Sequence, residues 1–65
     1  MEYKFICKTQ SKKIILYSKI YDTPSDMISS VRSGVLFYNA TNADKIIDVT
    51  VERDGSQKQQ HLKIN

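Results

Sequence analysis

The 65-residue chain has few of the residues that usually hold very small domains together. It contains one cysteine, one proline, two glycines and no tryptophan. The single cysteine, Cys7, excludes an internal disulfide and a zinc site built from several cysteines. A chain of this length buries only about 60% of the surface of its unfolded state, so its stability is marginal. Because neither a disulfide nor a metal is at hand, we expect self-association, most simply a homodimer, to add stability.

Long hydrophobic runs are missing as well. No stretch approaches the ~18 apolar residues that a membrane span needs. The first residues, MEYKFICK, alternate between polar and apolar side chains, unlike the apolar centre of a signal peptide. We therefore expect one small α+β domain over residues 1–65, located in the cytoplasm and without a membrane partner.

One segment, residues 23–38, has the pattern of an amphipathic helix. Thr23 suits the N-cap, Pro24 the first helical position and Asp26 the third. A stripe of apolar side chains follows along one side. It consists of Met27, Ile28, Val31 and Val35. The helix either ends at Gly34 or continues to Tyr38 with Phe37 on the opposite side. We favour continuation, because the stripe persists and a glycine within a helix costs only about 1 kcal/mol.

The other apolar segments have the alternation of β-strands, over residues 2–9, 13–21 and 45–53. In the last of these, Ile47, Val49 and Val51 share one face. Asp54-Gly55 is a strong signal for a two-residue hairpin turn, followed by a terminal strand. With such a turn, Val51 lies opposite Lys58, Val49 opposite Gln60 and Ile47 opposite Leu62. The predicted order is ββαββ, an α+β fold with one helix packed on a small, mainly antiparallel sheet.

Both faces of the predicted strand 13–21 are partly apolar. Ile14, Leu16, Ser18 and Ile20 point one way, and Ile15, Tyr17, Lys19 and Tyr21 point the other way. One helix covers only one face of a sheet, so we expect the second face to meet a partner or another part of the chain. We place a protein interface either at a sheet edge or on this outer face. Its predicted residues are Ile6, Ile15, Tyr17 and Tyr21.

Basic charge is concentrated at the start of the chain. The net charge is +3, yet residues 1–21 carry five lysines against one glutamate. A surface where lysines and aromatic rings interleave can hold a single-stranded nucleic acid, through phosphate contacts and base stacking. The residues of this alternative are Lys4, Lys8, Lys12, Lys13, Tyr17 and Lys19. The simpler interpretation is that the lysines keep a small sheet soluble and discourage aggregation at its edges.

The sequence holds no constellation that indicates catalysis. His61 is the only histidine and has no second ligand beside it, so we expect a solvated side chain and no metal site. Cys7 shares a strand face with Tyr3 and Phe5, the placement of a small core residue. No base accompanies any of the serines. We expect neither an enzyme nor a cofactor nor a small-molecule substrate.

About two thirds of the chain resembles the YegP-like family of small ββα proteins. The similar features are an aromatic-x-aromatic strand, Tyr3 and Phe5, and a second strand that ends in Ser-x-x-Tyr, Ser18 to Tyr21. The segments ISSV (28–31) and NATNADKIIDVT (39–50) are similar to that family's helix and the segment after it. The family's Asn-Gly turn is replaced here by Ser11-Lys12. The resemblance implies a compact, non-enzymatic domain that pairs with a second copy.

A second likeness, over residues 17–27 and 42–51, is to small phage proteins that include inhibitors of uracil-DNA glycosylase. Those inhibitors are acidic where they imitate DNA, whereas this chain is basic, so that activity is not carried over. Two hypotheses of function follow. The first is a non-catalytic protein-interaction module that self-associates or binds a host protein, for example as an inhibitor encoded by a phage or mobile element. The alternative is a nucleic-acid-binding protein that uses the basic, aromatic first hairpin.

Overall fold

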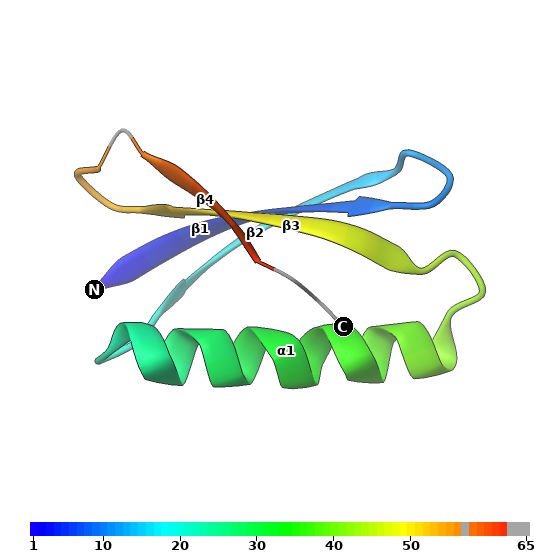
Figure 1. The fold of residues 1–65 in the computed structure, drawn as a ribbon, viewed down its shortest axis with the longest axis horizontal. Coiled ribbons are helices and arrows are strands. Elements are labelled where there is room, and N and C mark those ends of the chain that lie inside the picture. The colour runs from blue at the N-terminus through cyan, green and yellow to red at the C-terminus, as the bar shows by residue number, and fades with distance from the viewer. Residues whose placement is uncertain (57, 63–65) are drawn as a thin grey trace.

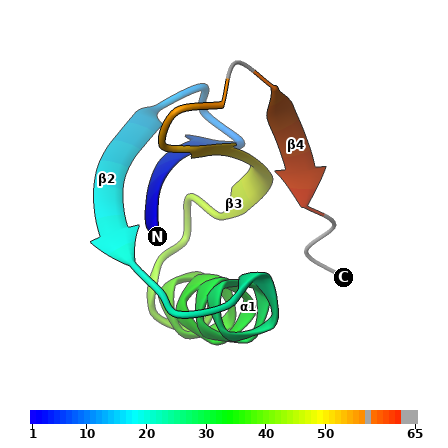
Figure 2. The same cartoon turned by 90° about the vertical axis from the view of Figure 1, so that its left-hand side faces the viewer.

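The computed structural model describes residues 1–56 and 58–62, and it has the predicted ββαββ order. The elements are β1 (Glu2–Thr9), β2 (Ile14–Ile20), α1 (Pro24–Thr41), β3 (Ile46–Arg53) and β4 (Gln59–Leu62). The four strands form one sheet in the order β2-β1-β3-β4, and every neighbouring pair is antiparallel. The helix runs beneath the sheet (Figure 1). Seen along the helix, the sheet is curved, with β2 and β4 at its two sides and α1 across the open side (Figure 2).

The helix begins where its capping residues predict. Thr23 is extended, and its Oγ1 accepts a hydrogen bond from the Asp26 N–H at 3.1 Å. The helix continues past Gly34 to Thr41, which confirms continuation and extends the predicted end. At its C-terminus the Asn42 Nδ2 donates to the Tyr38 carbonyl at 2.9 Å, so a side chain satisfies a carbonyl that the helix leaves free.

The core lies between α1 and one face of the two central strands. Its nine buried hydrophobic residues come from β1, α1 and β3 in equal numbers. They are Tyr3, Phe5, Cys7, Met27, Val31, Val35, Ile46, Val49 and Val51. The alternation in β1 and most of the helix stripe are thereby confirmed, while Phe37 lies exposed on the far side of the helix.

The prediction that Ile47 shares a face with Val49 and Val51 is wrong. The pairing of β3 with β1 is irregular at this point: Lys8 lies opposite Asp48, but the next residue, Thr9, lies opposite Ile46. One extra residue in β3 is thus bulged out of the ladder. As a result Ile46 enters the core, and Ile47 is 58% exposed.

The register of the second hairpin also differs from the prediction. Gly55 has φ +78° and the Ser56 N–H donates to the Arg53 carbonyl at 2.9 Å, so a turn does form at Asp54-Gly55. Pairing resumes only at Gln59, however, and Val51 lies opposite Gln60 and Val49 opposite Leu62. The loop is therefore longer than the two-residue turn we predicted. Because the shift is two residues, Leu62 still faces the core.

Candidate interaction surface at the free edge of β2

The structure separates the four predicted interface residues onto two faces. Ile6 lies opposite Leu16 on the face away from the helix, whereas Tyr17 lies opposite the buried Phe5 and Ile15 opposite the buried Cys7. Ile15 and Tyr21 both pack against the core. The single outer face that we predicted for these residues therefore does not exist. Only Ile6 belongs to the surface that α1 leaves uncovered.

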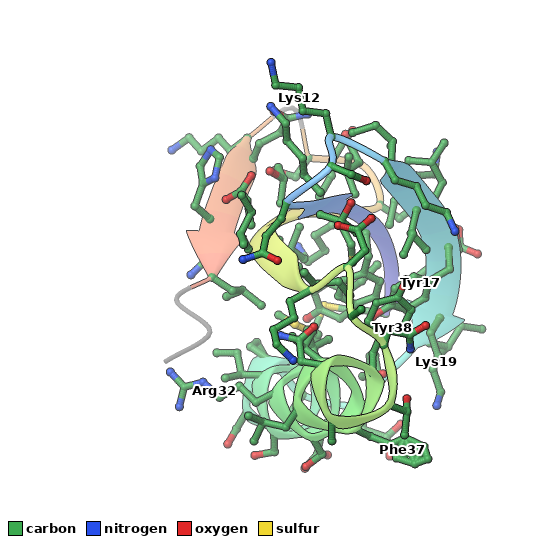
Figure 3. The ribbon with its side chains drawn as sticks, turned by 90° about the vertical axis from the view of Figure 1, so that its right-hand side faces the viewer. Lys12, Tyr17, Lys19, Arg32, Phe37 and Tyr38 are labelled. Carbon is green, nitrogen blue, oxygen red and sulfur yellow. The ribbon has the colours of Figure 1, made fainter. Side chains whose placement is uncertain are left out.

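The helix side of β2 is a groove lined with aromatic rings. The Tyr17 ring stacks on Phe5 with centroids 4.6 Å apart and planes 17° apart. The Tyr21 hydroxyl donates to the Ser30 Oγ of α1 at 3.0 Å, and the Lys19 ammonium lies 5.5 Å from the Tyr21 ring centroid. A cavity of about 320 Å³ remains between β2 and α1, with Tyr38 on its helix side. Figure 3 shows Tyr17, Lys19 and Tyr38 on this side of the molecule.

Partial burial in this groove affects the chemistry of Tyr17. Burial, and to a smaller degree the neighbouring Cys7 and Tyr21, raise the pKa of the Tyr17 phenol to about 12. The phenol is neutral over the physiological range at its ordinary pKa of about 10 as well, so this shift changes its charge only in strongly alkaline solution.

The other face of β2 presents aliphatic side chains to solvent. Ile14 is 51% exposed, and Leu16 and Ile20 are each 70% exposed. They alternate along a strand of seven residues. Leu16 lies beside Ile6 of β1, so the apolar surface extends one strand inward. We call Ile6, Ile14, Leu16 and Ile20 the outer apolar row.

The same residues of β2 also carry its unpaired backbone groups. The Tyr21 N–H donates to the Met1 carbonyl, and the Thr9 N–H donates to the Lys13 carbonyl. In an antiparallel ladder the groups of alternate residues point to opposite sides. The odd-numbered residues of β2 therefore bond to β1, and the even-numbered residues point away from the sheet. The free edge consequently offers the N–H and C=O groups of Ile14, Leu16, Ser18 and Ile20.

The basic residues of the nucleic-acid alternative do not form one surface. Lys4 and Lys8 lie on the outer face, directly opposite Glu52 and Asp48 of β3. Lys12 and Lys13 lie at the β1–β2 turn, and Tyr17 and Lys19 lie on the helix side. Figure 3 shows Lys12 at the far end of the molecule from Lys19. One face of the Tyr17 ring is already stacked on Phe5, which reduces the ring surface left for a base.

The two side chains considered for chemistry lie in ordinary settings. Cys7 is a buried free thiol, and burial, with a smaller effect of Asp48, raises its pKa. His61 is exposed and its Nδ1 lies 3.1 Å from an Asp48 carboxylate oxygen. Among residues 1–56 and 58–62, no three His, Cys, Asp or Glu side chains come together as metal ligands.

A cluster that the sequence did not indicate holds the turn before β2. Asp44 accepts hydrogen bonds from the Thr9 hydroxyl at 2.8 Å, the Ser11 N–H at 2.9 Å and the Ser11 hydroxyl. These hydrogen bonds lower the pKa of Asp44. The bond from the Ser11 side chain has the largest effect, followed by those from the Ser11 N–H and the Thr9 hydroxyl. The cluster thus ties the start of the free edge to the segment that follows α1. Asp44 lies 33 residues from Ser11 along the chain, so no local pattern points to it.

The core is also partly open beneath β4. A cavity of about 310 Å³ lies there, lined by Tyr3, Met27, Val51 and the polar residues of the β3–β4 loop and β4. The hydroxyl of Tyr3 is buried and, within the part of the chain that the structure describes, has no hydrogen-bond partner.

None of the described helices is both long enough and apolar enough to cross a membrane. Comparisons with family models, with curated proteins and with solved structures gave no match. The resemblance to the YegP-like family therefore stays a prediction.

Proposed function

We propose that the protein is a non-catalytic protein-interaction module that binds a partner along the free edge of β2. The observation that carries this proposal is the coincidence of two features on one strand. The four residues with unpaired backbone groups include three with exposed aliphatic side chains, Ile14, Leu16 and Ile20. A partner strand added at this edge would gain both backbone hydrogen bonds and apolar contacts.

Sheet edges in monomeric proteins usually carry features that prevent such pairing. These features are lysines at the edge, proline, bulges or very short strands. β2 has no proline, its pairing with β1 is regular along its length, and it spans seven residues. Its one lysine, Lys19, lies on the helix side. The edge is therefore open to a partner, and the burial that a partner adds would offset the small core of a 65-residue chain.

The proposal places this module in the cytoplasm, where an unpaired buried cysteine such as Cys7 suits the reducing conditions. The nucleic-acid alternative has less support, because its lysines and aromatic rings are spread over different surfaces and two of the lysines face carboxylates.

Affinity capture from a lysate of the source cells tests the proposal with two matched variants. Leu16→Glu adds a charge to the outer apolar row, and Leu36→Glu adds the same charge to the exposed side of α1, where Leu36 is 61% exposed. Both positions are exposed, so each variant should keep its stability within about 0.5 kcal/mol. We expect the wild-type protein and Leu36→Glu to retain the same protein partner, and Leu16→Glu to lose it. Treatment with nuclease should leave capture unchanged.

Two results would count against the proposal. Loss of capture in Leu36→Glu but not in Leu16→Glu would move the contact to the helix. Loss of capture after nuclease treatment, or a steep fall with salt, would favour the nucleic-acid alternative.

A further inference from the structure

We propose that the partner at the β2 edge is a second copy of this chain, with the two β2 strands antiparallel about a two-fold axis at Tyr17. This inference rests on the proposed function, because it names the occupant of the same edge. The two four-stranded sheets would join into one continuous sheet. A two-fold axis between antiparallel strands is perpendicular to the sheet, so both helices would lie on the same face.

The backbone restricts how two β2 edges can pair. Only the even-numbered residues of β2 direct their N–H and C=O groups outward. In a new antiparallel ladder these even-numbered residues must lie opposite one another, because the N–H and C=O groups of the odd-numbered residues already bond to β1. Registers that place an even residue opposite an odd one are thereby excluded.

Among the remaining registers, one pairs all the outward-facing residues. With Tyr17 opposite the partner's Tyr17, Ile14 lies opposite the partner's Ile20 and Leu16 opposite the partner's Ser18. Each of the four outward-facing residues of one copy then exchanges backbone hydrogen bonds with an outward-facing residue of the partner. With Leu16 opposite itself, or with Ser18 opposite itself, one of the four loses its partner within the strand. The centred register therefore makes the longest ladder.

The side chains favour the same register. On the outer face, Ile14 meets the partner's Ile20 and Leu16 lies next to the partner's Ser18, so the outer apolar rows of the two copies become continuous. Extended to the strand ends, this register brings Lys12 near the partner's Asp22, a pair of opposite charge. Placing Leu16 opposite itself would instead set Lys13 against the partner's Lys19, and placing Ser18 opposite itself would set Ile14 against the partner's Asp22. Like charges directly opposite each other destabilise a ladder.

Disulfide trapping reads out this register directly. In a Cys7→Ala background, which removes the native thiol, one variant carries Leu16→Cys and another Ser18→Cys. Residues that form a hydrogen-bonded pair have Cα atoms about 5.5 Å apart, within the range that a disulfide spans. The centred register predicts that an equimolar mixture, combined under reducing conditions and then oxidised, forms crosslinked dimer at least about tenfold faster than either variant alone. Gln59→Cys, at the other edge of the sheet, is the matched control and should remain uncrosslinked.

The outcomes separate this inference from the proposed function. Faster crosslinking of Leu16→Cys alone, of Ser18→Cys alone or of Gln59→Cys would overturn the register. Sedimentation of the wild-type protein needs no substitution and should show a dimer at tens of micromolar. A strict monomer that still captures a different protein through Leu16 would overturn the second copy as partner but leave the proposed function standing. A monomer that captures nothing would overturn both.

Discussion

The two edges of the sheet differ in chemistry. β2 runs for seven residues and presents three exposed aliphatic side chains, whereas the described part of β4 has four residues, of which Gln59, Gln60 and His61 are polar and exposed. An edge strand with few apolar side chains offers a pairing chain little apolar contact. The outer face of β2 carries no charged side chain, proline or bulge that would hinder pairing with another strand. Under the proposed function, the β4 edge ends the sheet and the β2 edge receives the partner.

The largest expected effect comes from introducing proline at each edge in turn. Ser18 directs its N–H outward, so Ser18→Pro removes no hydrogen bond from the ladder with β1. The proline ring blocks any strand that approaches β2. We expect self-association to be lost at micromolar concentration, while the free energy of unfolding of the isolated chain changes by less than about 1 kcal/mol. Analytical ultracentrifugation and urea unfolding measure the two quantities.

Gln59→Pro is the control at the other edge. By the same alternation, Gln60 and Leu62 bond to β3, so the N–H of Gln59 points away from the sheet. This variant should associate as the wild-type protein does. If Gln59→Pro weakened association and Ser18→Pro did not, the assignment of the two edges would have to be reversed.

What the sequence predicted correctly depends on local patterns. The cap at Thr23, the helix stripe and the alternation in β1 each involve residues within a few positions of one another. The errors concern how strands are set against each other. The bulge that exposes Ile47 exists only in the pairing of β3 with β1, and the Asp54-Gly55 turn does not itself fix where β4 starts to pair. Such registers depend on contacts that no single strand contains.

The same limit explains the misplaced interface. Each face of β2 was grouped correctly, but which group lies beside Phe5 depends on the length of the β1–β2 turn. A shift of one residue in the register of β2 against β1 would place Leu16 or Ser18 opposite Phe5 and Tyr17 on the outer face. The structure has Tyr17 opposite Phe5, and three aliphatic residues at a period of two on the other face. The alternation of apolar residues in the sequence could therefore have pointed to Ile14, Leu16 and Ile20, the residues at the proposed contact.

A smaller difference in stability is expected between substitutions in the two loops that precede the edge strands β2 and β4. Asp44 ties the β1–β2 turn to the segment after α1 through three hydrogen bonds, with no equivalent within the described part of the β3–β4 loop. Its pKa is lowered in the folded protein, so its contribution to stability is present above the ordinary Asp pKa and is lost as pH falls through the lowered value. We expect Asp44→Asn to lower the urea midpoint at pH 7, and the difference from wild type to shrink steadily below about pH 4.

Asp54→Asn supplies the comparison in the other loop. The Asp54 side chain is exposed, and asparagine suits the same turn position, so the urea midpoint at pH 7 should match that of the wild-type protein. A difference between Asp44→Asn and wild type that stayed constant from pH 7 to pH 2.5 would show that the charge of Asp44 is not what holds the turn.

The smallest effects are expected from the backbone of the two turns. Each turn contains one residue in the left-handed region, Lys12 with φ 70° in the first and Gly55 with φ +78° in the second. This conformation costs roughly 1–2 kcal/mol for a residue with a Cβ and little for glycine. Gly55→Ala should therefore lower the free energy of unfolding by about 1 kcal/mol. Lys12→Gly relieves the same strain but adds freedom to the unfolded chain, so we expect a gain between zero and about 1 kcal/mol. Urea unfolding of both variants checks these expectations; a loss of stability in Lys12→Gly would contradict the expected gain and would mean that the added freedom of the unfolded chain outweighs the strain relieved at Lys12.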